Sequence, residues 1–337
     1  MAAPERFQVG DTVLQSGMTL PGVTLSYRTH GVLNAARDNA VLVPTYYGGQ
    51  HAQTEWLFAE GMALSPRDWF IIVPDMLGNG LSSSPSNTAA PFDGPRFPHV
   101  TLYDNVRLQH RLVTERFGIE RLRLVAGWSM GAQQTYHWAA LYPHMVAAIA
   151  PFCGSARTSR HNFLFLDGVK AALQADAAFR GGDYDAPPLV GLKAFSRVYA
   201  GWAFSQTFFR EEIDLKVMGS GSIDGFVTGV MEPAFLARDA NDLLAMLWSW
   251  QNADISANDL YGGDFDRALG AITARAIVLP GATDLYFPPE DNAYEVARMP
   301  NAELRPIPSI WGHCAGLGAN PADTAFIDAA LRELLAG

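Results

Sequence analysis

The sequence predicts an α/β protein with a mostly parallel sheet and a block of helices inserted between its strands. Continuous apolar runs alternate with helix-like segments over residues 1–155, and the alternation resumes after residue 271. The residues between carry several helical patterns and few strand patterns. Strands buried on both faces of a parallel sheet are continuously apolar, and their alternation with helices is typical of right-handed β-α-β connections.

The first part of the chain is expected to supply most of the sheet. The predicted strands are 6–15, 22–29, 39–47, 69–76, 121–129 and 145–153, and the predicted helices are 54–63, 102–117 and 130–141. The first two strands are expected to pair around a turn at Pro21-Gly22. Pro143 is expected to end the helix before it, because proline cannot continue an α-helix.

The helical insertion and the last part of the chain complete the expected order. Helices are predicted at 160–175, 188–204, 205–217, 223–231 and 240–251, strands at 274–284 and 302–309, and a final helix at 322–335. We therefore expect one core formed by residues 1–155 and 271–337, interrupted by a helical lid at 156–270.

Composition bounds the partners that we expect. Of 337 residues, 49% are hydrophobic and 17% are charged, and the net charge is −10. This acidic balance, without any cluster of basic residues, argues against a nucleic acid or an anionic membrane as partner. The longest stretch free of formal charge, 124–156, is interrupted by Gly, Pro, Gln and His, which favours buried core over a membrane span.

The cysteines and the missing motifs bear on location and cofactors. The two cysteines, Cys153 and Cys314, do not suggest a disulfide framework, and the N-terminus shows no apolar signal segment. We therefore expect a reduced, cytoplasmic protein. The sequence contains no CxxC, HExxH, P-loop or GxGxxG pattern. We expect no metal and no cofactor, so the chemistry must come from ordinary side chains.

One serine stands where an apolar strand gives way to a helix. The stretch Gly127-Trp128-Ser129-Met130-Gly131 fits the G-x-S-x-G pattern of a nucleophile elbow, in which small residues flank a very tight turn. The pattern alone is weak, but its position between strand and helix favours a catalytic Ser129. The positive end of the following helix also favours an oxyanion at this place.

A serine nucleophile needs a base and an acid, which in this kind of fold follow in the order Ser, acid, His. Of the two downstream histidines, His313 follows the last predicted strand and is favoured as the base, whereas His161 lies in the insertion. Asp284 follows a predicted strand and is favoured as the acid over Asp291, which lies in the next helix. Asp75 is interpreted as a brace for the turn that follows it.

The oxyanion hole is expected to consist of two main-chain N–H groups. One is that of Met130, directly after the nucleophile, and the other comes from the loop after strand 39–47, with Tyr46 as first choice.

Several longer stretches resemble the homoserine O-acetyltransferase-like branch of the α/β-hydrolase superfamily. They are DMLGNGLSSSPSN, FPHVTLYDNVRLQHRLVTERFGI, GWSMGAQQ, GATDLYFPPED and WGHCAGL. The resemblance implies the α/β-hydrolase fold, and it places nucleophile, acid and base on Ser129, Asp284 and His313. It also places the oxyanion position on Tyr46 and implies a homodimer formed through the lid helices.

The chain departs from this family where the substrate is expected to bind. True homoserine acetyltransferases carry a stretch similar to A-R-x-x-x-H-x-T-Y-R in the first lid helices. The last arginine of this stretch is expected to hold the carboxylate of the substrate. Here Arg197 is kept, but that last position is Ser205, and the Tyr position is Phe204. An unpaired carboxylate in an apolar pocket is costly, which argues against homoserine. The lid is aromatic, and Trp202 and Phe204 are candidates to line an apolar pocket.

Three functions remain open from the sequence. The first is a serine hydrolase that cleaves an ester, lactone or activated amide through an acyl-serine, which the missing arginine favours. The second is an O-acyltransferase with an acyl-CoA donor and a changed acceptor. The third, disfavoured because all three triad residue types are present, is a non-catalytic binding protein with this fold.

Overall fold

The computed structural model describes residues 4–336, and over these residues it holds one eight-stranded sheet in the order β1-β2-β4-β3-β5-β6-β7-β8. The strands are β1 (Glu5–Val13), β2 (Thr19–His30), β3 (Ala40–Leu42), β4 (Phe70–Pro74), β5 (Leu124–Trp128), β6 (Ala148–Phe152), β7 (Arg275–Val278) and β8 (Ala302–Leu304). The pairs of β1 with β2 and of β2 with β4 are antiparallel, and all others are parallel. The predicted α/β fold class is confirmed.

The turn between the first two strands is not at Pro21-Gly22, as the sequence predicted. Val13 pairs with Thr19, and the amide of Leu14 donates to the main-chain oxygen of Met18, so the hairpin turns at residues 15–18. Gly17 there has φ of +83°, a conformation that glycine adopts without steric cost. Pro21 and Gly22 instead lie inside β2.

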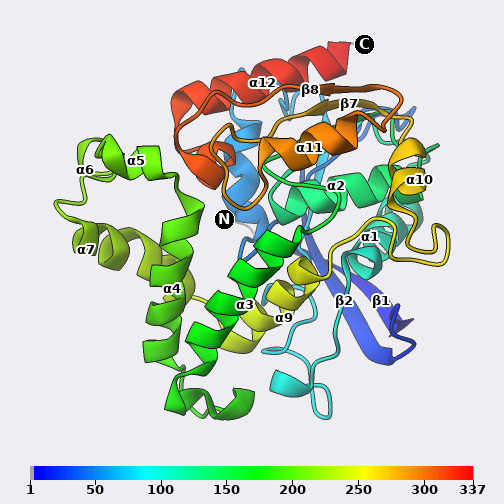
Figure 1. Ribbon diagram of the computed structural model, residues 1–337. Coiled ribbons are helices and arrows are strands. Elements are labelled where there is room, and N and C mark those ends of the chain that lie inside the picture. Colours follow the sequence, from blue (N-terminus) through cyan, green and yellow to red (C-terminus); the bar gives the residue numbers. More distant parts are fainter. Residues whose placement is uncertain (1–3, 337) are drawn as a thin grey trace.

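Both faces of the sheet are covered by helices (Figure 1). Successive residues of a strand point to opposite faces. In β3, Val41 belongs to the buried cluster that contains Ile327 of the last helix, α12 (Pro321–Ala336). Leu42 belongs to the other cluster, which contains Val106 of α1 (Leu102–Arg111) and Trp138 of α2 (Met130–Leu141). This two-sided burial explains why the central strands are continuously apolar.

Between β6 and β7 the described elements are helices. They are α3 (Arg160–Gln174), α4 (Leu189–Ala203), α5 (Gln206–Arg210), α6 (Ile213–Lys216), α7 (Ile223–Phe226), α8 (Glu232–Leu236), α9 (Ala240–Gln251) and α10 (Phe265–Gly270), with a short 3-10 helix at Ala177–Gly182 and a π-helical turn at Val227–Met231. Figure 1 shows α3, α4 and α9 beside the sheet, with α5, α6 and α7 farther out. Leu192 and Trp250 continue the buried cluster that contains Val41.

Four predicted helices differ from the observed ones. The helix expected at 102–117 is α1 followed by a π-helical turn at Leu112–Arg116. The helix expected at 54–63 is a 3-10 helix at His51–Phe58, a form used in short pieces. The helix expected at 205–217 is broken into α5 and α6 because Glu212 adopts φ of +57°. The stretch 223–231 is α7 followed by the π-helical turn, just before Pro233, which lacks the amide hydrogen of a regular helix.

After β7, the chain forms α11 (Pro289–Val296), β8 and a 3-10 helix at Gly312–Gly316 before α12. Since parallel strands end at the same edge of the sheet, the loops after β3, β5, β7 and β8 meet there. These loops carry all the residues that the sequence marked as catalytic.

Candidate active site

Ser129 lies on a strained turn between β5 and α2. Its backbone angles are φ 58° and ψ −125°, which a residue with a side chain seldom adopts. A Cβ atom on Gly127 would lie 2.5 Å from the main-chain carbon of Gly131, so the turn can be this tight only with glycine at residue 127. The turn therefore has the geometry of a nucleophile elbow.

Three side chains from three loops meet at this turn. His313 Nε2 lies 2.9 Å from Ser129 Oγ, and His313 Nδ1 lies 2.8 Å from Asp284 Oδ2. The other oxygen of Asp284 accepts hydrogen bonds from the amides of Tyr286 and Phe287, at 2.8 and 3.1 Å. With Nδ1 facing a carboxylate, the Nε2 atom is left to take the serine proton.

The three groups are closed off from solvent, with 2% of Ser129, 1% of His313 and 4% of Asp284 exposed. Aromatic rings surround the imidazole. The ring centroid of Tyr286 lies 4.8 Å from that of His313, edge-on, and the centroid of Phe287 lies 5.5 Å away. Such burial excludes water and strengthens each electrostatic contact of the imidazole.

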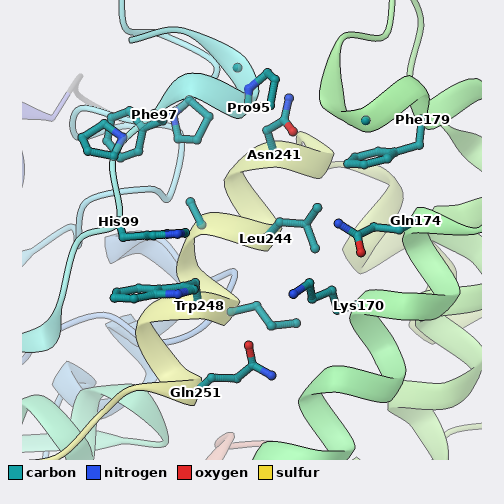
Figure 2. A pocket seen from close by; sticks show the side chains of 16 residues that line it. Pro95, Phe97, His99, Lys170, Gln174, Phe179, Asn241, Leu244, Trp248 and Gln251 are labelled. Atoms are coloured by element: carbon teal, nitrogen blue, oxygen red, sulfur yellow. The ribbon is translucent and has the colours of Figure 1, made fainter.

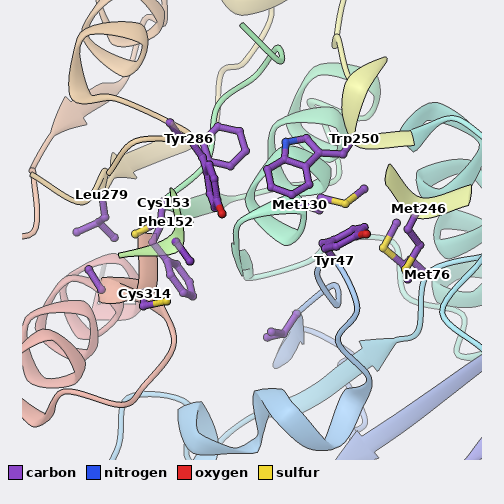
Figure 3. Close-up of a cluster of buried hydrophobic side chains, with 14 of the residues drawn as sticks. Tyr47, Met76, Met130, Phe152, Cys153, Met246, Trp250, Leu279, Tyr286 and Cys314 are labelled. Atoms are coloured by element: carbon purple, nitrogen blue, oxygen red, sulfur yellow. The ribbon is translucent and has the colours of Figure 1, made fainter. Parts of the chain in front are cut away.

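A set of apolar and aromatic side chains is packed around the elbow (Figure 3). Tyr47 packs on Trp250 of α9, and Trp250 packs edge-on against Tyr286, with centroids 5.5 Å apart in each pair. The hydroxyl of Tyr47 donates to the main-chain oxygen of Leu243. These contacts join the loop after β3, the helix α9 and the loop after β7 into one packed wall.

The amides of Tyr46 and Met130 lie on neighbouring segments. A Cβ atom on Gly131, the second residue of α2, would lie 2.6 Å from the main-chain oxygen of Pro44, so the loop after β3 runs against the start of the helix. Over residues 4–336, neither the Tyr46 nor the Met130 amide donates to a protein acceptor. One unpaired amide at a helix N-terminus and a second in the adjacent loop are donors suited to bind an oxyanion.

Asp75 braces the same loop from its other end. Its carboxylate accepts hydrogen bonds from the amide and the Nδ1 atom of His51, from the hydroxyl of Ser26 and from the side-chain amide of Asn79. Asn79 also donates to the main-chain oxygen of Gly49. Asp75 thus ties the turn after β4 to the loop that carries Tyr46.

The residues expected to bind substrate lie in different environments. Arg197, which is half-exposed, pairs with Glu232 at 3.1 Å and with Asp224 at 3.4 Å. The hydroxyl of Ser205 caps α5 by accepting from the amide of Phe208 and donates to the main-chain oxygen of Ile310. The structure therefore commits both polar groups to protein partners.

The two aromatic candidates also differ. Phe204 packs against Phe208 of α5 and Phe226 of α7. Trp202 contacts Phe165, whose ring stacks on Tyr286 with centroids 4.7 Å apart. Trp202 therefore contacts a ring that stacks on Tyr286, the ring beside the imidazole, whereas Phe204 pairs with other rings of the same buried cluster.

Sequence reasoning missed several residues that hold the site together. Trp128 contacts His313 directly, Tyr286 packs on the same imidazole, and Gln134 donates to the main-chain oxygen of Thr45 in the loop after β3. Trp128 lies inside the elbow motif and Tyr286 lies two residues after Asp284, so proximity to the motifs was the available signal. Gln134 carried no such signal.

The two cysteines are free and buried, and burial raises the pKa of both thiols. Cys153 and Cys314 are therefore neutral thiols inside the buried cluster of Figure 3, and such burial disfavours a nucleophilic role. Among residues 4–336, no group of three or more His, Cys, Asp or Glu side chains is arranged to hold a metal ion.

A separate cavity of about 300 Å³ lies on the other side of α9 (Figure 2). Its walls include His99 and Trp248, whose rings stack with centroids 4.1 Å apart, and Lys170 of α3. None of the three triad side chains lines it.

Within the described part of the chain, no helix is both long and apolar enough to cross a membrane.

Comparison with known proteins agrees with this geometry. Residues 41–317 match the family model described as the alpha/beta hydrolase fold. The chain belongs to the α/β-hydrolase family, and the predicted fold is confirmed.

Individual relatives narrow the class. An ethyl acetate hydrolase of Pseudomonas veronii is 42% identical, over 98% of this chain and 95% of its own. The solved structure of the acetyl esterase MekB superposes with a TM-score of 0.97 at 41% identity, covering 100% of this chain and 97% of the other. A homoserine O-acetyltransferase of Nostoc punctiforme is 32% identical, over 96% of this chain and 92% of its own. The resemblance to that branch is confirmed, and the protein is a carboxylic ester hydrolase, as predicted.

Proposed function

We propose that the protein hydrolyses short-chain carboxylic esters, acetyl esters foremost, through an acyl intermediate on Ser129. The observation that carries the proposal is the unbroken hydrogen-bonded series from Ser129 Oγ through His313 to Asp284. The similarity to an ethyl acetate hydrolase and to an acetyl esterase supports a small acyl group.

The geometry accounts for each step of such a reaction. His313 Nε2 accepts the Ser129 proton as Oγ attacks the ester carbonyl, and Asp284 stabilises the imidazolium that forms. The tetrahedral oxyanion is held by the amides of Tyr46 and Met130. His313 then gives the proton to the leaving alcohol. In the second half, His313 activates water, which releases the acid and restores Ser129.

Hydrolysis is favoured over acyl transfer to homoserine by the state of two polar residues. Ser205 stands where the resemblance placed the carboxylate-binding arginine. Its hydroxyl donates to the main-chain oxygen of Ile310 and accepts from the amide of Phe208. Arg197 is paired with two carboxylates. Neither residue therefore offers a free cation to an amino-acid carboxylate, whose unpaired burial is costly.

The arrangement of the molecule in the cell is part of the same proposal. Residues 156–270 act as a lid over the core of 1–155 and 271–337, and the chain forms a homodimer through its lid helices. Exposed apolar side chains on the lid, such as Leu164, Val190 and Val217, support that interface.

The two free cysteines favour a location in the cytoplasm, where thiols stay reduced. The acidic net charge favours neither a nucleic acid nor a membrane as partner.

One assay tests hydrolysis against transfer. Purified protein is given an aryl acetate in water and, separately, acetyl-CoA with and without homoserine, with Ser129→Ala as the blank. We expect rapid release of the aryl alcohol and no homoserine-dependent release of free thiol. Thiol release that requires homoserine, or another alcohol, overturns the proposal in favour of an acyltransferase. Equal rates with Ser129→Ala remove the acyl-serine intermediate.

A further inference from the structure

A series of buried, hydrogen-bonded side chains reaches the loop after β3 that carries Thr45 and Tyr46, here called the oxyanion loop. Trp138 Nε1 donates to Gln109 Oε1 at 2.8 Å, and Gln109 Nε2 donates to Gln134 Oε1 at 2.6 Å. Gln134 Nε2 then donates to two main-chain oxygens, those of Thr45 at 2.8 Å and Met130 at 3.1 Å. All three side chains have no exposed surface. A buried polar series of this kind is worth its cost only when every member is paired.

The indole sets the direction of the whole series. An indole N–H only donates, so the Gln109 atom that faces Trp138 must be the amide oxygen. The Gln109 NH₂ group then faces Gln134, which must present its own oxygen in return. As a result, Gln134 directs both of its amide hydrogens toward the carbonyls of Thr45 and Met130. Reversing either amide would bring like groups together.

The two carbonyls that Gln134 holds belong to the segments that form the oxyanion hole. In a planar trans peptide the N–H points away from the C=O. Fixing the Thr45 carbonyl toward Gln134 therefore aims the Tyr46 N–H the opposite way. The Thr45 hydroxyl also accepts from the amide of Met76 at 3.0 Å, which anchors the same residue from another side. The Met130 carbonyl belongs to the next peptide along the chain, so Gln134 anchors the first residue of α2, which carries the second oxyanion donor, and does not orient that N–H directly.

We propose that Gln134 is a positioning residue for the oxyanion hole, holding the Tyr46 and Met130 amides in register through its single side-chain amide. The inference rests on the proposed function. Gln134 does not touch substrate in this scheme. Its effect belongs to the transition state, because the oxyanion forms only there.

The test compares two adjacent buried glutamines of α2. Gln134→Met keeps length and volume but removes both donors. Gln133→Met is the matched control, since Gln133 is equally buried and its amide donates to Thr158 instead of the oxyanion loop. We expect Gln134→Met to lower kcat about 10- to 100-fold, somewhat less than loss of an oxyanion donor itself, with KM changed by less than about threefold. Gln133→Met should stay within about threefold of wild type in both constants.

A transition-state readout separates positioning from general damage. A trifluoromethyl ketone adds to the catalytic serine and places an oxyanion in the hole. Its inhibition constant should rise for Gln134→Met in proportion to the loss of kcat/KM, because both report the same stabilisation. Gln109→Met, which removes the partner that orients Gln134, should give a smaller loss. The double variant should be no worse than Gln134→Met alone, since both act through one group.

The outcomes are distinct. Equal losses in Gln133→Met and Gln134→Met, or an unchanged inhibition constant beside a reduced kcat, would overturn the positioning role. A loss confined to KM would do the same. If Gln134→Met does not fold, Gln109→Met is the deciding variant, and wild-type inhibition by the ketone would then overturn the proposal. If Ser129→Ala hydrolyses the ester at the wild-type rate, then the proposed function is wrong, and this result is distinct from a failure of the role of Gln134.

Discussion

The indole Nε1 of Trp128 donates a hydrogen bond to the main-chain oxygen of His313 at 3.0 Å, and the two rings are stacked with centroids 5.0 Å apart. Trp128 immediately precedes Ser129 in the chain. One residue of the elbow therefore holds the loop of the base against the nucleophile. Its ring also packs edge-on against Tyr46, with centroids 4.5 Å apart. Trp128 therefore contacts the loop after β3 as well as the loop that carries His313.

We expect Trp128→Phe to lower kcat about fivefold, because it keeps an aromatic ring beside His313 but loses a hydrogen bond worth about 1 kcal/mol. Trp128→Ala should cost more, since the stacking is lost as well. Steady-state kinetics on an aryl acetate measures both. Trp248→Phe is the control, because Trp248 stacks on His99 at the separate cavity. A Trp128→Phe enzyme as active as wild type contradicts the inferred coupling.

Ser129→Ala should abolish turnover and leave the fold intact, with a loss in kcat on the order of 10⁴–10⁶. His313→Ala should be nearly as damaging, and the double variant hardly worse, because the two residues act as one unit. Steady-state rates and circular dichroism measure activity and folding. More than about a tenth of wild-type activity in Ser129→Ala would remove that residue from its role.

Asp284→Asn should fold normally but lose kcat on the order of 10⁴, because the neutral amide no longer holds the imidazole in the required tautomer. Asp291→Asn is the matched control: Asp291 lies in the first turn of α11, away from the hydrogen bonds that join the triad. The two variants are compared by kcat and by thermal denaturation. If Asp291→Asn is the crippled enzyme and Asp284→Asn is normal, the acid is wrongly assigned.

Burial raises the pKa of Glu295 to about 7, from an ordinary value of 4.5, although Asn292 and the amide of Ala156 donate hydrogen bonds to its carboxylate. Between these two pH values the native state holds the proton and the unfolded chain does not. The free energy of unfolding should therefore fall as pH rises from 4.5 to 7, by about 3 kcal/mol from this residue.

Denaturant unfolding of wild type and Glu295→Gln at about pH 5 and about pH 8 measures this contribution. The variant cannot ionise, so its stability should fall less between the two pH values than that of wild type. Glu290→Gln, on the exposed side of the same helix, is the control and should follow wild type. An identical pH dependence in wild type and Glu295→Gln contradicts the expectation.

The sequence pointed to Ser129, Asp284 and His313 because their signals are local. The elbow needs glycines at fixed spacing, Asp284 follows a strand that an apolar run predicts, and His313 follows the last predicted strand, 302–309. Residues at the carboxyl ends of parallel strands must meet at one edge of the sheet, so the order of elements was enough to expect their meeting. The structure brings the three side chains within hydrogen-bonding distance.

The turn of the first hairpin and the ends of some helices could not be predicted from local sequence patterns. The hairpin turned at residues 15–18 and not at Pro21-Gly22, because the pairing of β1 with residues 19–27 of β2 decided the register. The helix expected at 205–217 broke at Glu212, among the helices between β6 and β7. Propensity is a weak guide where tertiary contacts compete with it.

The sequence by itself determined the order of the strands, the fold class and the three groups proposed as nucleophile, base and acid, since each follows from periodicity, from the order of elements or from the spacing of a few neighbouring residues. Only the tertiary structure decided that Gln134, Trp128 and Ser205 donate hydrogen bonds to the main-chain oxygens of Thr45, His313 and Ile310, respectively. These contacts join residues 89, 185 and 105 positions apart. No local pattern encodes such pairs, because they arise only when packing of the whole chain brings distant loops to one edge of the sheet.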